Sequence, residues 1–140
     1  MPITSQDGLR AMLDYKTIAV VGCSAMPGKA AHEIPAYMQR HGYRVIPVNP
    51  YRDEILGETA YDSLADVEED IDLVNVFRPS AEAGAVVDAA IDRAAERGDV
   101  KAVWLQLGIR DDEAAKRAEA AGLEYVQDSC YKVVHARLVV

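Results

Sequence analysis

Cysteine, phenylalanine and tryptophan are scarce in this sequence, and it has no long hydrophobic run. The two cysteines, Cys23 and Cys130, are too few for a disulfide scaffold and lack metal-ligand spacing, so we expect a reducing, cytoplasmic setting. No run of about 18 apolar residues occurs, which argues against a membrane-spanning helix. The first residues lack a basic start and an apolar core, so we predict neither a secretory signal nor a membrane partner.

Basic residues are also in the minority. The 15 Lys and Arg residues face 23 Asp and Glu residues, which gives a formal net charge of −8. Such a protein repels polyanions at long range, and a single Phe and a single Trp leave no series of rings for base stacking. We therefore expect no nucleic-acid partner, although a local pocket can still hold a small anion.

Apolar runs of strand length, by contrast, recur along the chain and alternate with amphipathic stretches. Strands are predicted at 17–22, 43–48, 71–77, 100–107 and 123–127. Helices are predicted at 3–15, 32–41, 63–68, 79–97 and 111–121, and from 129 onward. Ser63 is the expected N-cap of the short third helix. Gly42, Gly98 and Gly122 are expected to end the helices before them.

This alternation predicts an α/β fold. Continuous apolar strands joined by helices are typical of a parallel sheet that is covered on both faces. We expect residues 1–140 to form one Rossmann-like domain, a doubly wound parallel sheet of about five strands in the order 3-2-1-4-5, with helices on both faces. Pro47, near the end of the second strand, favours an edge or terminal position for that strand.

Ligands of such sheets bind beyond the carboxyl ends of the strands. Gly22 ends the first strand, and Gly28 and Lys29 precede a helix whose first N–H groups would favour an anion. The segment matches neither the GxxxxGK[ST] loop nor GxGxxG, and a tight turn without a ligand explains it equally well. Asn49 stands where an NAD-binding unit would carry Asp or Glu for the ribose, and Asn49-Pro50 fits ordinary turn chemistry.

The third and fourth strands also end in candidate ligand contacts. Arg78 could pair with a phosphate and Phe77 could stack on a base, whereas the alternative is a solvated Arg beside a core Phe. Gln106 and the Gly108 backbone offer neutral hydrogen-bonding groups, while Trp104 is expected in the core. No nucleophile is paired with a base in the sequence, so we predict no catalytic and no metal site.

The order of several short motifs resembles a known family. VGCSAMPGK, HGYRVIPVNP, EILG, YDSL, IDLVNVFRPS, VWLQLGI and the closing DSC with a later His look like the small single-domain coenzyme A-binding proteins. These proteins are similar to the N-terminal domain of the succinyl-CoA synthetase α subunit. The resemblance runs from about residue 15 to the end of the sequence, and it implies a Rossmann-like domain that binds coenzyme A (CoA) across its strand ends.

The resemblance also implies which residues would bind CoA. The phosphates would meet Gly22, Cys23, Ser24 and Lys29, and the nucleotide would be lined by Val48, Asn49, Pro50 and Arg52. Phe77 and Arg78 would flank the adenine and phosphate region, and Gln106, Gly108 and Ile109 would close the other side. Few residues follow the last predicted strand, so we expect no synthetase domain bearing a phosphorylated histidine. The implied function is a CoA- or acyl-CoA-binding carrier, sensor or regulatory module without catalysis.

Other functions stay open on the same fold. The main alternative is an NAD(H)-binding redox sensor or oxidoreductase-like domain. A thiol role for Cys23, through a mixed disulfide with CoA, and a protein-interaction module with an unused pocket are further interpretations. The sequence does not decide between a homo-oligomer and a complex with a protein partner.

Overall fold

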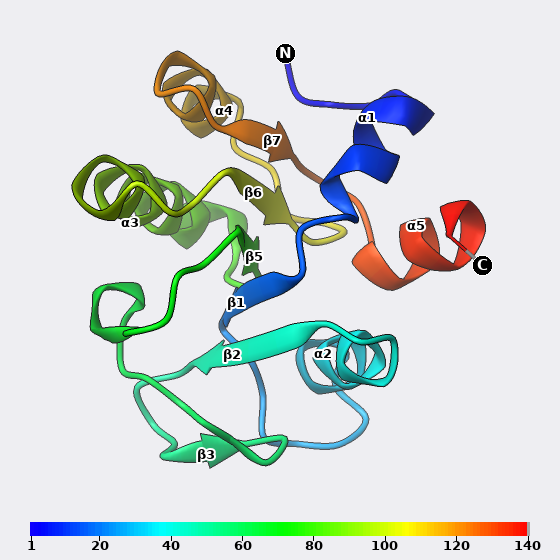
Figure 1. Ribbon diagram of the computed structural model, residues 1–140, viewed down its shortest axis with the longest axis vertical. Helices are drawn as coiled ribbons and strands as arrows, with labels where there is room; N and C mark the ends of the chain where they lie inside the picture. The colour runs from blue at the N-terminus through cyan, green and yellow to red at the C-terminus, as the bar shows by residue number, and fades with distance from the viewer. Residues whose placement is uncertain (140) are drawn as a thin grey trace.

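A five-stranded parallel sheet forms the centre of the molecule (Figure 1), in a computed structural model that describes residues 1–139. Its spatial order is β2 (Arg44–Val48), β1 (Thr17–Val21), β5 (Leu73–Val76), β6 (Ala102–Leu105) and β7 (Glu124–Val126). Neighbouring strands pair in parallel throughout. The predicted Rossmann-like α/β class is confirmed.

The predicted strand order, however, was wrong. The third predicted strand, β5, pairs with β1 instead of extending the sheet beyond β2, so the order of the five strands is 2-1-3-4-5. Pro47 supplies a physical reason. Its carbonyl accepts a hydrogen bond from the Tyr61 N–H at 3.0 Å on the outer side of β2, and proline has no N–H to offer there. Proline therefore keeps β2 at the sheet edge, as its position in the sequence indicated, and β5 takes the free side of β1.

Helices cover both faces of the sheet (Figure 1). The helices α1 (Gln6–Met12), α2 (Ala30–Arg40) and α5 (Tyr131–Leu138) pack on one face. The helices α3 (Ser80–Arg97) and α4 (Asp112–Ala120) pack on the other. Each face has its own cluster of buried apolar side chains, and the fully buried Trp104 donates its indole N–H to the Ser129 carbonyl at 2.8 Å. Trp104 is therefore a core residue, as predicted.

Glycines end the helices where the sequence indicated. Gly98 lies in the left-handed region with φ 73°, and its N–H bonds the Ala94 carbonyl at the end of α3. Gly42 and Gly122, with φ of 87° and 85°, follow α2 and α4 in the same backbone region. These turns bring the chain back to β2 and β7.

The connection from β2 to β5 differs from the usual crossover helix. It contains a small antiparallel hairpin of β3 (Glu54–Ile55) and β4 (Glu58–Thr59), followed by the 3₁₀ helix η1 (Leu64–Asp66). The expected helix over 63–68 is only this one turn. Ser63 occupies its N-cap position, as predicted, but its hydroxyl donates to the Asp66 carboxylate at 3.0 Å and accepts no capping hydrogen bond from the backbone. The hairpin was not predicted from the sequence. Since no full helix covers β1 and β2 here, the ends of these strands border an open cleft beside α3.

Within residues 1–139, no helix is both long and apolar enough to cross a membrane.

Candidate functional site

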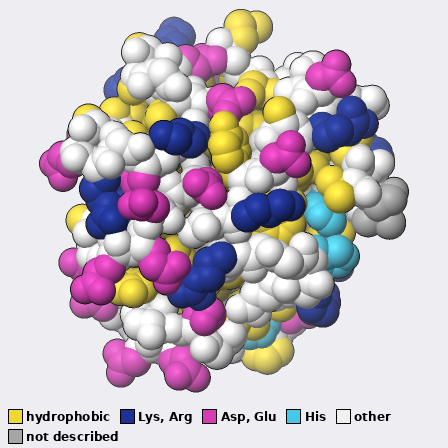
Figure 2. All heavy atoms as spheres, in the orientation of Figure 1, with side chains coloured by type: hydrophobic (Ala, Val, Ile, Leu, Met, Phe, Trp, Pro, Cys, Tyr) yellow, Lys and Arg dark blue, Asp and Glu magenta, His cyan; other side chains and the backbone are white. Residues whose placement is uncertain are grey.

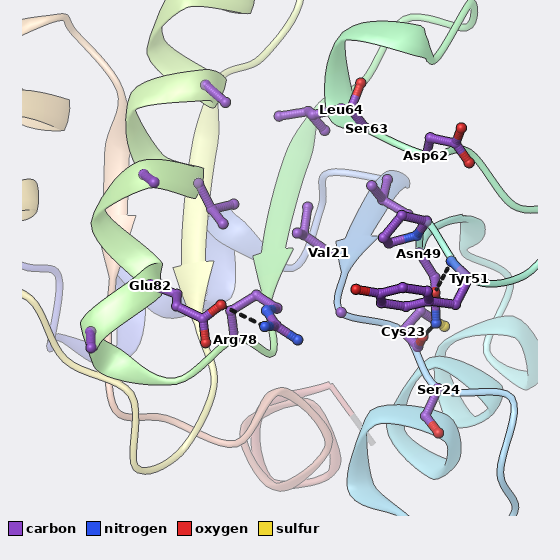
Figure 3. A pocket seen from close by; sticks show the side chains of 17 residues that line it. Val21, Cys23, Ser24, Asn49, Tyr51, Asp62, Ser63, Leu64, Arg78 and Glu82 are labelled. Atoms are coloured by element: carbon purple, nitrogen blue, oxygen red, sulfur yellow. Dashed lines mark hydrogen bonds and ion pairs between the residues drawn. The ribbon is translucent and has the colours of Figure 1, made fainter.

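A cavity of about 680 Å³ opens at the carboxyl ends of β1 and β2 (Figure 3). Its floor is formed by strand ends, one wall by the N-terminal half of α3, and the other wall by the segments around Tyr51 and η1. This is the size of cleft that holds cofactors and drug-sized ligands. It also lies where parallel sheets bind ligands, beside the point at which the strand order reverses between β1 and β5.

The cavity brings together seven of the thirteen residues that the sequence analysis assigned to CoA. These are Gly22, Cys23, Ser24, Val48, Asn49, Pro50 and Arg78. They come from three different strand ends, which meet because parallel strands end at the same edge. The remaining six, Lys29, Arg52, Phe77, Gln106, Gly108 and Ile109, lie outside its lining.

Gly22 sets the shape of the floor. Its φ of 89° lies in the left-handed region, which glycine adopts without a steric penalty. A Cβ atom at this position would approach the Arg78 Cδ and the Phe77 carbonyl oxygen to 3.1 Å each. The chain after β1 can therefore pass close to the end of β5 only with glycine here, and this places the 22–24 loop against the cavity.

Asn49 ties two strand ends together. Its side-chain N–H donates to the Cys23 carbonyl at 2.9 Å, and its side-chain oxygen accepts the Tyr51 N–H at 2.8 Å. The second bond is an Asx turn, which is the turn chemistry that the Asn-Pro pair indicated. Both ends of the amide thus serve the protein's own backbone. Asn49 supplies no carboxylate for a ribose diol, in contrast to NAD-binding domains.

Arg78 is the one cation among the residues that line the cavity. Its guanidinium pairs with the Glu82 carboxylate at 2.6 Å across the first turn of α3, and both side chains are about half exposed. Such a solvated pair, between the residue that precedes the N-cap of α3 and a residue in its first turn, is weak, about 0.3–0.5 kcal/mol. A phosphate could therefore replace Glu82 as the partner of Arg78 at little cost.

Cys23 is unsuited to thiolate chemistry. The residue is fully buried, and burial raises the pKa of its thiol to about 12. A thiol of this kind carries almost no thiolate at neutral pH, and the thiolate is the reactive form. The geometry thus argues against the mixed-disulfide role that the sequence left open.

The predicted residues outside the lining serve other parts of the fold. Gln106 is buried, and its side-chain oxygen accepts the Tyr131 N–H at 3.3 Å, at the start of α5. Gly108 donates its N–H to Asp128 at 2.8 Å. Ile109 and Phe77 pack against the two core clusters, which agrees with the core alternative for Phe77.

Two predicted cations are also absent from the lining. Lys29 is exposed at the N-terminal boundary of α2, and Arg52 is exposed in the loop after Tyr51. The sequence placed both near the strand ends with Arg78, but only Arg78 reaches the cavity.

Sequence reasoning missed the two walls. The α3 wall consists of the small and apolar residues Ala81, Ala85, Val86 and Ala89 together with Glu82, and the opposite wall includes Tyr51, Asp62, Ser63 and Leu64. The spacing of the alanines, at intervals of four, was available as a signal, because it places them on one side of the helix. The second wall comes from a loop, and its position depends on tertiary contacts.

The buried Arg93 of α3 provides those contacts. It donates to the carbonyls of Leu64, Val67 and Glu69, each at 2.8 Å, and it pairs with Asp99 at 3.0 Å. Burial alone would raise the pKa of Asp99, but hydrogen bonds from the Ile71 N–H and from Arg93 outweigh this effect, so the pKa of Asp99 lies below its usual value. This ionised pair fixes the η1 segment, and therefore the second wall, at a set distance from α3.

The surface charge is mixed. Figure 2 shows Asp and Glu side chains densest at the lower left of one face, with Lys and Arg side chains interspersed toward its middle. No group of His, Cys, Asp and Glu that could hold a metal ion occurs among the described residues. The net charge of −8 is therefore spread over the surface, and the cavity itself carries one cation and the carboxylates of Glu82 and Asp62.

Comparison with known proteins gives a consistent result. A family model described as a CoA binding domain matches residues 16–136. The uncharacterized protein YneT of Bacillus subtilis is 39% identical over 121 residues, which cover 86% of each chain. The ADP-forming acetate–CoA ligase of Methanocaldococcus jannaschii is 31% identical over 96 residues, which cover 69% of this chain but 13% of the ligase. A solved structure of a hypothetical protein from Pyrococcus horikoshii superposes with a TM-score of 0.91 at 35% identity, over 100% of this chain and 97% of that one.

Proposed function

The chain belongs to the CoA-binding domain family, and from this we propose that it binds CoA or an acyl-CoA in the cavity between α3 and the ends of β1 and β2. In this proposal it acts as a carrier, sensor or regulatory module and catalyses no reaction. The observation that carries the proposal is the cavity itself, which joins seven of the residues implied by the family resemblance into one lining.

The residues present suit a nucleotide ligand with phosphates. A volume of about 680 Å³ falls within the range of cofactor clefts. Arg78 would bind a phosphate by charge-assisted hydrogen bonds once it separates from Glu82. The alanines of α3 leave room for the flat or extended parts of the ligand.

The proposal favours binding over catalysis because the thiol in the cavity lining is not activated. Cys23 is buried with a raised thiol pKa, and the pair of Arg78 and Glu82 is an ordinary surface ion pair. Both cysteines are free thiols, which agrees with a reducing cytoplasm as the proposed setting. The acetate–CoA ligase relative matches this chain over only 13% of its own length, so its reaction is not part of the proposal.

Isothermal titration calorimetry with CoA, acetyl-CoA and NAD tests this function. We expect heat with CoA and acetyl-CoA and none with NAD. The absence of heat at millimolar CoA and physiological salt would contradict the proposal, and heat with NAD alone would support the redox alternative. Chromatography of acetyl-CoA incubated with the protein, ADP and phosphate tests the absence of catalysis, which predicts that the thioester stays intact.

A further inference from the structure

Tyr51 differs from every other tyrosine of the chain. Of the seven tyrosines, it alone is exposed, at 88% of its surface, whereas the other six are buried or partly buried. It nevertheless lines the cavity. Figure 3 shows its side chain projecting into the cavity from the side opposite Arg78 and Glu82. An exposed ring at the wall of a ligand cleft offers its face to a planar group of a bound molecule.

The backbone beneath this ring is held in place. The Tyr51 N–H bonds the Asn49 side chain at 2.8 Å, and Asn49 in turn bonds the Cys23 carbonyl at 2.9 Å and, through its own N–H, the Tyr61 carbonyl at 2.8 Å. Pro50, between them, has a fixed φ. The backbone at Tyr51 is therefore already ordered before a ligand binds, which lowers the entropy lost on binding.

The charges of the cavity give the ligand a direction. Its one lining cation, Arg78, lies across from Tyr51 and is paired with Glu82 at 2.6 Å, while Asp62 lies on the same wall as Tyr51. A phosphate would be attracted to Arg78, where it competes with Glu82, and it would be repelled by Asp62, which has no cation beside it in the lining. A neutral planar base with an exocyclic amino group suits the side of Tyr51, because the amino group is a donor and the Asp62 carboxylate is an acceptor.

From these observations we propose that Tyr51 is a specificity-determining residue, which stacks on the purine ring of the ligand while the phosphates lie toward Arg78. The inference rests on the proposed function, because it assigns the two ends of CoA to two sides of the same cavity. Stacking of a base on an aromatic side chain strengthens binding. Loss of the ring should therefore weaken the affinity for CoA about tenfold.

Two substitutions and two ligands test the assignment by calorimetry. Tyr51→Leu removes the ring, and Tyr51→Phe keeps it without the hydroxyl; because the side chain is exposed, both variants should fold, which circular dichroism checks. CoA contains the adenine, whereas 4′-phosphopantetheine has only the other end of the molecule. Leu107→Ala is the matched control, since Leu107 is also an exposed apolar residue, at 65%, but lies outside the lining.

The expected result is about a tenfold loss of CoA affinity in Tyr51→Leu, near-native affinity in Tyr51→Phe and Leu107→Ala, and equal 4′-phosphopantetheine binding by the wild type and Tyr51→Leu. If Tyr51→Leu binds CoA as tightly as the wild type does, the role of Tyr51 is overturned while the proposed function stands. An equal loss in Tyr51→Phe, which would assign the effect to the hydroxyl, or an equal loss for 4′-phosphopantetheine would overturn that role too. No CoA binding by the wild type would overturn the proposed function as well, so the two failures are distinguishable.

Discussion

Replacement of Arg78 by Met removes the one cation of the cavity lining while it keeps much of the side-chain volume. Arg78 is about half exposed and pairs with Glu82 at 2.6 Å, so the loss of that pair should change the free energy of unfolding by no more than about 0.5 kcal/mol. The effect on binding should be larger. A hydrogen bond to a charged group contributes about 1.5–3 kcal/mol, and partial exposure places Arg78 at the lower end of that range.

The expected result for Arg78→Met is therefore about a tenfold weaker CoA complex, because about 1.4 kcal/mol corresponds to a factor of ten. Glu82→Gln should act in the opposite direction. It removes the carboxylate that competes with a phosphate for Arg78, and the loss of an exposed pair of about 0.3–0.5 kcal/mol corresponds to about twofold tighter binding. Both changes should shrink as salt is raised, since ions screen half-exposed charges.

Calorimetric titration of CoA into each variant at low and at physiological salt measures these effects. Arg110→Met is the matched control, because Arg110 is an exposed arginine outside the cavity lining that pairs with Asp112 and Asp128. Affinity within twofold of wild type in Arg78→Met would refute the role of Arg78. An equal loss in Arg110→Met would also refute it, since the effect would then come from the overall field of the protein.

Three further predictions concern the stability of the fold. Gly22→Ala should lower stability more than Gly28→Ala. Alanine at either position costs about 1–2 kcal/mol because both have positive φ, but only at Gly22 would the added Cβ meet neighbouring atoms at 3.1 Å. Equal melting temperatures of the two variants would contradict this. Arg93→Met should cost about 3–5 kcal/mol in urea unfolding, because it removes the buried cation that lies 3.0 Å from the buried Asp99 carboxylate. Arg97→Met, at a half-exposed side chain 3.9 Å from Asp99, should cost about 0–1 kcal/mol, and similar midpoints would count against the role of Arg93. Burial and the nearby His41 and Lys16 lower the pKa of His135 below its ordinary 6.5, so its neutral form stabilises the fold fully above about pH 6.5 and that contribution is lost as the pH falls through the lowered value. His135→Gln should flatten this part of the stability–pH curve, and an unchanged slope would exclude His135 as its source.

The elements of this fold follow largely from local sequence signals. The alternating apolar runs and amphipathic stretches located the five strands of the central sheet and the main helices, because burial on both faces of a parallel sheet requires continuous apolar strands. The strand order was missed, since it depends on which side of β1 receives β5. Pro47 carried the necessary information: its missing N–H faces the outer side of β2, where a further strand would need a donor.

The candidate site was predictable at its floor and less so at its walls. Gly22, Asn49 and Arg78 follow strand ends, and parallel strands must end at one edge, so their proximity could be inferred. Tyr51 and the η1 segment belong to an irregular connection whose position is fixed by buried hydrogen bonds of Arg93 with backbone carbonyls. Bonds of this kind leave no periodic trace in the sequence. The prediction that Gln106 lines the site was missed for a related reason, because its side chain points into the protein and accepts a hydrogen bond at the start of α5.

The most direct test of the account is whether CoA occupies this cavity. Ala85→Phe places a ring in the lining from the exposed side of α3, and Ala120→Phe adds the same ring to an exposed position of α4 outside the cavity. Calorimetric titration of CoA should show binding to the wild type and to Ala120→Phe, with binding abolished or severely weakened in Ala85→Phe. Equal CoA affinity in all three proteins would contradict the central claim.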